Sequence, residues 1–109
     1  MLFLEEAKVF LDKLDEKARD KIIYNIRKAQ VSNDKELFKK LSGEIWEFRT
    51  LFNKTYYRLF AFGDKTDNTD TVVISTHGLI KKTGQIPQGD IDKALRIRRL
   101  YLEQKIKKK

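Results

Sequence analysis

Three consecutive segments in the middle of the chain have strand patterns, and they constrain the fold more than any other feature. The first alternates between apolar and polar residues, the second is rich in aromatic residues, and the third is expected to be the most buried. They cover residues 44–51, 55–62 and 71–76. A period of two residues is typical of strands that bury one face. Consecutive strands usually lie beside each other in a sheet, and Asn53-Lys54 supplies a turn between the first two. The middle of the chain therefore predicts an antiparallel sheet of three or more strands.

Helical patterns lie on both sides of these strands. Apolar residues recur at helical spacing over residues 4–14 and, after a change of phase, over residues 18–29. Residues 36–41 are expected to form a short helical or irregular connector. A last helix is expected to begin after Pro87, with Asp90 in its first turn. The chain thus predicts an α+β fold with two N-terminal helices, the sheet, and a C-terminal helix.

Length and composition narrow the class of protein. The 109 residues suffice for one domain, expected to span residues 1–109. No apolar run approaches the ~20 residues that span a bilayer, and the N-terminus lacks a signal-peptide pattern, so a cytoplasmic location without a membrane partner is expected. With no cysteine and one histidine, neither a disulfide nor a zinc site is expected, and no cofactor is implied.

Positive charge is concentrated near the C-terminus. Residues 1–80 hold 14 Lys or Arg against 13 Asp or Glu, whereas residues 81–109 hold 10 against 3, which is +7 of the net +8. Such asymmetry favours a polyanionic partner, and nucleic acid is the expected one. A solvated basic tail at residues 105–109 is the alternative.

The sole histidine lies directly after the third predicted strand, in the segment 75–83. His77 is followed within five residues by Lys81 and Lys82. An imidazole exchanges protons near neutral pH, because its ordinary pKa is ~6.5, and ammonium groups attract a phosphodiester. This combination suits RNA cleavage without a metal. A plain strand end that leads into a basic loop would explain the same residues.

Four pieces of the sequence, taken in order, resemble the RelE/HigB-like toxins of bacterial type II toxin–antitoxin modules, within the RelE/ParE superfamily. The pieces are Ile45–Arg49, Tyr57–Leu59, His77–Thr83 and Ile91–Ala94. The resemblance extends over most of residues 3–102. The pattern of that family usually begins with a strand, for which only residues 1–4 are available here. A very short N-terminal edge strand is therefore expected, unless the start of the chain is cut relative to its relatives.

The resemblance implies the toxin of a type II toxin–antitoxin system. Its implied activity is that of a metal-independent endoribonuclease, an mRNA interferase that inhibits translation by cleaving messenger RNA, commonly on the ribosome. The ribose 2′-hydroxyl would attack the phosphodiester. The implied partners are a cognate antitoxin of the helix-turn-helix type, the ribosome and mRNA.

Such a reaction needs a base, an acid and cations that stabilise the charged phosphorane. The catalytic candidates are Arg58, His77 and Lys82. Arg58 matches the arginine of the family's second meander strand, and its guanidinium fits two phosphate oxygens. The alternatives are an ion pair of Arg58 with Glu47 across the sheet, a structural hydrogen bond for His77, and a solvated side chain for Lys82.

The substrate-binding candidates are Arg49, Lys81 and Tyr101. Arg49 would orient a phosphate, or else bridge Glu44 or Glu47. Lys81 would contact ribosomal RNA, or else be solvated. Tyr101 would supply an acid or a stacking ring, although its position on the apolar stripe of the last helix favours a buried or half-buried tyrosine.

Residues 55–62 also carry aromatic side chains on the same predicted face as Arg58. These are Tyr56, Phe60 and Phe62. An aromatic ring left open beside Arg58 would stack an RNA base, whereas Phe60 and Phe62 are expected in the core.

Two other functions remain open on this fold. One is a non-catalytic binder, such as a ParE-like gyrase inhibitor. The other is a nucleic-acid-binding accessory domain whose cations hold phosphates without chemistry.

Overall fold

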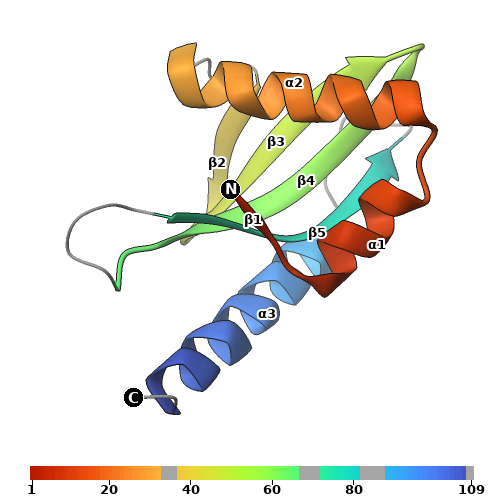
Figure 1. The fold of residues 1–109 in the computed structure, drawn as a ribbon. Helices are drawn as coiled ribbons and strands as arrows, with labels where there is room; N and C mark the ends of the chain where they lie inside the picture. Colours follow the sequence, from red (N-terminus) through yellow and green to blue (C-terminus); the bar gives the residue numbers. More distant parts are fainter. Residues whose placement is uncertain (33–36, 67–71, 82–87, 108–109) are drawn as a thin grey trace.

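The computed structural model describes residues 1–32, 37–66, 72–81 and 88–107 (Figure 1). The predicted α+β fold is confirmed, with two N-terminal helices, a sheet and a C-terminal helix. In chain order the elements are β1 (Leu2–Phe3), α1 (Glu5–Asp12), α2 (Glu16–Ser32), β2 (Phe38–Ser42), β3 (Ile45–Phe52), β4 (Thr55–Asp64), β5 (Val72–Lys81) and α3 (Gln88–Lys107).

The strands form one sheet in the order β1-β5-β4-β3-β2. Strands β2 to β5 are antiparallel neighbours, as predicted for the three central segments. The expected N-terminal edge strand is present as β1, which pairs in parallel with β5 through Leu2↔Ile74 and Phe3↔Ser75. The backbone N–H of Leu4 donates to the carbonyl oxygen of Ser75 at 3.0 Å, and this bond joins the chain start to the sheet.

The prediction of a helical or irregular connector at residues 36–41 is wrong, because β2 begins at Phe38. The ring of Phe38 stacks on Trp46 at 4.6 Å and on Phe48 at 4.2 Å between ring centroids. This aromatic contact holds β2 against β3. The register shifts between Lys40 and Ser42, so the short strand lacks the alternation by which strands are recognised in sequence.

The predicted end of the third strand at Thr76 is also wrong, since β5 continues to Lys81. His77 therefore lies inside a strand. Pairing changes from Phe60↔His77 to Ala61↔Ser75, which leaves Thr76 as the extra residue of a bulge. Gly78 is required here by packing: a Cβ at this position would lie 2.3 Å from a ring carbon of Phe10 in α1.

Helices cover both faces of the sheet, and the two N-terminal helices share one of them (Figure 1). The predicted apolar stripe of α2 is buried there, and Asn25 Nδ2 donates to Thr50 Oγ1 of β3 at 3.2 Å. The core on this face includes Ala7, Leu11, Ile22, Ile26, Ala29, Phe48, Leu59 and Ala61.

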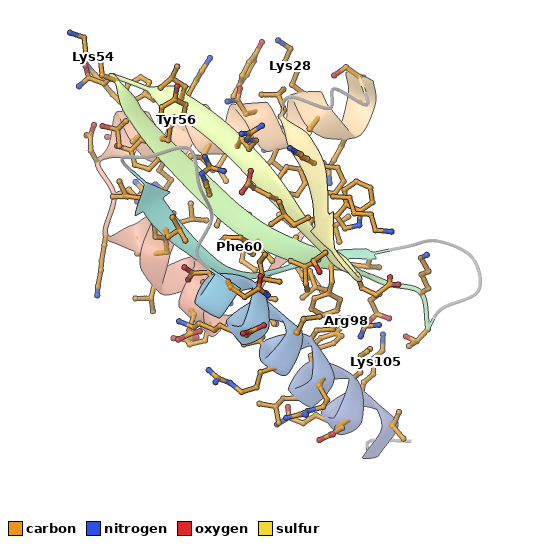
Figure 2. All side chains as sticks on the ribbon, turned by 180° about the vertical axis from the view of Figure 1, so that it is seen from behind. Lys28, Lys54, Tyr56, Phe60, Arg98 and Lys105 are labelled. Carbon is orange, nitrogen blue, oxygen red and sulfur yellow. The ribbon has the colours of Figure 1, made fainter. Side chains whose placement is uncertain are left out.

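Helix α3 packs on the opposite face. The core there contains Ile45, Phe60, Phe62, Ile74 and Ala94, so the expected burial of Phe60 and Phe62 is confirmed. The helix begins beside His77 and runs toward Asp64 at the end of β4, where Tyr101 and Lys105 bond to that carboxylate. Seen from behind, α3 crosses one part of the sheet, and Tyr56 lies away from it (Figure 2). No helix in the described ranges is long and apolar enough to cross a membrane.

Candidate functional site

Three charged side chains of β3 and β4 form what we call the arginine cluster: Glu47, Arg49 and Arg58. The carboxylate of Glu47 is fully buried and accepts from Arg58 Nη1 at 2.9 and 2.8 Å. It also forms an ion pair with Arg49, with 2.9 Å between Oε1 and Nε. Arg49 and Arg58 are direct partners in the register of the two strands. Like charges at such a position repel each other, so Glu47 is the counter-charge that holds them together. The cluster keeps one positive charge in excess.

The two arginines differ in accessibility. The side chain of Arg58 is 3% exposed, whereas that of Arg49 is 37% exposed. The Nε of Arg58 is buried and has no hydrogen-bond partner among the described residues. The ion pairs with Glu47 that sequence analysis gave as alternatives are therefore present for both arginines. Arg49 is the member that an incoming phosphate can reach, and the phosphate-clamp role of Arg58 stays a prediction.

His77 lies on the same face of the sheet, next to the cluster. It is 3% exposed, and its ring stacks on Phe60 with 4.8 Å between centroids. Nδ1 lies 3.1 Å from Thr76 Oγ1 and Nε2 lies 3.2 Å from Asp90 Oδ1 of α3. Because a carboxylate only accepts, Nε2 carries the proton that faces Asp90. The hydroxyl of Thr76 donates to the carbonyl oxygen of Phe60 at 3.4 Å and lies within hydrogen-bond distance of Nδ1.

The environment of His77 lowers its pKa. Burial is the largest cause and outweighs the hydrogen bond to Asp90, which raises the pKa; Lys93 lowers it further. The imidazole is therefore neutral at pH 7. Both of its nitrogens have partners within the protein, and these are the side chains of Thr76 and Asp90, not the neighbouring backbone that the structural alternative for His77 expected. The role of His77 as acid or base stays a prediction.

The register shows which predicted site residues come together. Arg58 is opposite Leu79, so Arg58 and His77 are diagonal neighbours at about 7–8 Å between Cα atoms. The backbone of Lys81 pairs with Tyr56 at the end of β5, but its side chain lies outside what the structure describes. Lys82 also lies outside the described residues.

Tyr101 belongs to a different group of side chains, around Asp64. The hydroxyl of Tyr101 donates to Asp64 Oδ2 at 2.7 Å and Lys105 Nζ donates to the same oxygen at 2.6 Å. Asp64 is six residues from Arg58 along β4, about 20 Å at strand spacing. Tyr101 is half-buried and anchors α3, so the structure does not bring it to the arginine cluster.

The same contacts shift the pKa values of this group. Burial raises the pKa of Asp64, but hydrogen bonds from Lys105, Thr66 and Tyr101 outweigh it and hold the pKa well below its ordinary value. Burial and then the bond to Asp64 raise the pKa of Tyr101. Lys105, which sequence analysis placed in a basic tail, instead continues α3 and is bound at its tip.

Sequence reasoning missed the role of three residues. Asp90 was recognised as part of a helix start, but not as the partner of His77. Asp64 lies between the predicted strands 55–62 and 71–76, and no sequence signal shows that its carboxylate is buried. Tyr56 was one of three aromatic candidates on its strand face, and burial separates it from the other two: it is 44% exposed.

Further positive charge lies on α3. Arg96, Arg98 and Arg99, with Asp92 and Leu95, line a shallow hollow of about 450 Å³. The guanidinium of Arg98 lies 5.9 Å over the ring of Phe62, within cation–π range. Within the described ranges there is no grouping of three or more His, Asp or Glu side chains that would hold a metal ion.

The arginine cluster should dominate local stability. Glu47→Gln removes the counter-charge of two arginines, and we expect it to lower the free energy of unfolding by about 3–5 kcal/mol. A Glu47→Leu/Arg58→Met double variant should recover much of this loss, because it leaves no unpaired buried charge at either position. Urea unfolding followed by Trp46 fluorescence measures both. Glu44→Gln, in the exposed turn before β3, is the matched control, and a loss below 1 kcal/mol for Glu47→Gln would contradict the geometry.

The lowered pKa of His77 predicts a dependence of stability on pH. Since the unfolded chain binds this proton more readily, the free energy of unfolding should fall as the pH drops from 7 through ~6.5, by up to about 1.4 kcal/mol per unit. His77→Gln keeps every carboxylate but lacks the imidazole. The free energy of unfolding of this variant should therefore fall less between pH 7 and pH 5 than that of the unaltered protein. Urea unfolding at pH 7, 6 and 5 compares the two proteins, and parallel pH profiles would show that His77 is not buried in neutral form.

Comparison with known proteins places the chain in a family. Residues 9–99 match the model of a family described as Phage derived protein Gp49-like (DUF891), which covers well over half of the chain. Searches of curated proteins and of solved structures found no match. The Gp49-like family falls within the RelE/ParE-like superfamily of toxins from toxin–antitoxin modules, so membership is consistent with a toxin and implies an antitoxin partner. The resemblance is thus confirmed for the superfamily: this chain belongs to the Gp49-like family of phage-derived proteins.

Proposed function

We propose that this protein is a toxin that acts as a metal-independent endoribonuclease and cleaves mRNA on the ribosome, in the cytoplasm. The observation that carries the proposal is the arginine cluster, in which a buried carboxylate fixes two guanidinium groups on the sheet face beside the start of α3. Family membership supports the toxin, and the positive charge of the cluster supports a phosphate-bearing substrate.

The chemistry depends on fixed positive charge. Attack of a ribose 2′-hydroxyl on the phosphodiester builds negative charge on the phosphorane oxygens, and preorganised cations stabilise it. Arg49 is accessible, and its ion pair with Glu47 is made through Nε, so we expect its terminal nitrogens to bind phosphate. Arg58 lies behind it with little exposed surface, where the low dielectric strengthens its field.

Proton transfer would use a group near these arginines. His77 is neutral at pH 7, which is the form that accepts a proton from a 2′-hydroxyl. Its Nε2 carries the proton and faces Asp90, and its Nδ1 faces Thr76. The imidazole therefore serves as a base only after one of these contacts is exchanged for one with the substrate and the nitrogen that meets the 2′-hydroxyl is unprotonated. Lys81 and Lys82 complete the proposed group of site residues. Lys81 would contact ribosomal RNA, and Lys82 would contact the scissile phosphate.

Binding to the ribosome would use the basic last quarter of the chain. Arg96 and Arg99 are exposed on α3, and residues 81–109 carry +7 of the net charge. Contacts of this kind with ribosomal RNA weaken as salt rises, because they release counterions. An antitoxin, proposed to be of the helix-turn-helix type, would neutralise the toxin by covering this charge or by blocking access to the ribosome.

A second function is supported by the burial of the candidate groups. Arg58 is 3% exposed and both nitrogens of His77 have partners inside the protein. These facts favour a protein that binds the phosphates of a nucleic acid through Arg49 without cleaving the nucleic acid. The ParE-like inhibition of gyrase has no comparable observation in its favour.

Arg49→Ala tests the proposal while Glu47 keeps its buried partner Arg58, and urea unfolding checks that the variant is folded. We expect mRNA cleavage in a purified translation system, read by primer extension, to slow at least tenfold, which corresponds to about 1.4 kcal/mol of lost transition-state stabilisation. Arg27→Ala, on the exposed face of α2 across the sheet, is the matched control and should cleave at the normal rate.

The outcomes separate the candidate functions. Cuts at fixed codon positions that appear only with ribosomes support the proposal, and cuts without ribosomes would make the protein a free ribonuclease. An unchanged rate for Arg49→Ala would remove the arginine cluster from the site. No cleavage by the unaltered protein in either condition would leave the non-catalytic binder, with gyrase inhibition as the next assay.

A further inference from the structure

One aromatic side chain on the α3 side of the sheet stays open to solvent. Phe60 and Phe62 of β4 are buried at 0% and 1% exposure, whereas Tyr56, on the same strand face, is 44% exposed. Its partner in the register is Leu51 of β3, which is 55% exposed. Figure 2 shows Tyr56 on the part of the sheet away from α3.

This open pair is bordered by cations. Arg58 follows Tyr56 by two residues on the same face, about 7 Å along the strand. Arg49 precedes Leu51 by two residues and lies opposite Arg58 in the register. The nearest acid in the register, Glu47, is already bound to both arginines. An exposed ring therefore lies beside an excess of positive charge.

We propose that Tyr56 is a stacking platform for an unpaired RNA base, with Leu51 extending the apolar surface and Arg49 holding the adjacent phosphate. This inference rests on the proposed function, because it takes RNA as the substrate, and it adds that the RNA is single-stranded at this point. A base inside a duplex is stacked on its neighbours and cannot lie on the ring.

The charge pattern selects RNA over a protein partner. An apolar protein surface would contact only Tyr56 and Leu51, and it would form no favourable interaction with the neighbouring guanidinium groups. A nucleotide uses both features, since its base has an apolar face and its phosphate is anionic. Because every base has such a face, Tyr56 should contribute affinity with little preference for one base.

The chain provides a matched control on the opposite face of the sheet. Tyr24 of α2 is 59% exposed and also has a cation nearby, with Lys21 Nζ 5.2 Å from the ring centroid. Replacing either tyrosine removes the same atoms from an exposed site. Only the substitution at Tyr56 should affect RNA binding.

Fluorescence anisotropy with a labelled eight-nucleotide 2′-O-methyl RNA tests the inference, since this probe cannot be cleaved by 2′-hydroxyl attack. We expect Tyr56→Ala to raise the Kd about 5- to 150-fold. The Kd of Tyr56→Phe should stay within about twofold of that of the unaltered protein, because the ring remains. Tyr24→Ala should have no effect on the Kd. The slope of log Kd against log salt should stay unchanged in Tyr56→Ala and fall by about one in Arg49→Ala.

Each other result has a distinct meaning. Equal affinity of Tyr56→Ala and the unaltered protein, with weaker binding by Arg49→Ala, would overturn the stacking platform and leave the proposed nuclease in place. If Tyr24→Ala weakened RNA binding as much as Tyr56→Ala does, the stacking platform would also be overturned. No RNA binding by the unaltered protein would overturn both the platform and the RNA substrate. A dimer that Tyr56→Ala converts to monomer, with RNA affinity unchanged, would show that the surface binds a second copy instead.

Discussion

The carboxylate of Glu47 is the interaction on which the candidate site depends. It is fully buried between two guanidinium groups that face each other across β3 and β4. Without it, the pairing of these strands would bring two like charges together, so the carboxylate makes a basic sheet face compatible with a stable sheet. The same contacts leave Arg49 fixed but accessible, and a fixed cation is what a developing phosphorane requires.

Helices cover one face of the sheet more fully than the other. The more fully covered face holds the larger core, and the less covered face holds the residues of the proposed function. α1 and α2 form the larger core on one face. On the other, α3 is held at its start by His77 and Asp90 and near its end by Asp64, so it runs away from the end of β4 that carries Tyr56. The arginine cluster and the exposed aromatic therefore lie at the same end of the sheet.

Much of the fold follows from periodicity in the sequence, and much of the site does not. Alternation identified β3, aromatic content identified β4, and an apolar stripe at helical spacing identified α2. β2 was missed because a register shift interrupts a strand of five residues, and the length of β5 was missed because Gly78 resembles a turn signal although it serves close packing with Phe10. Whether Arg58 pairs with Glu47 or is free to bind phosphate depends on how deeply the two side chains are buried. The spacing of residues in the sequence does not reveal this burial.

The proposed function requires that RNA lies on this face of the sheet, against the arginine cluster. The most direct test is a crystal structure of the protein with a short 2′-O-methyl RNA, which blocks cleavage. We expect a phosphate within hydrogen-bond distance of the Arg49 guanidinium and a base on the ring of Tyr56. RNA bound instead along the outer surface of α2, or along the exposed arginines of α3 with the sheet face empty, would contradict it.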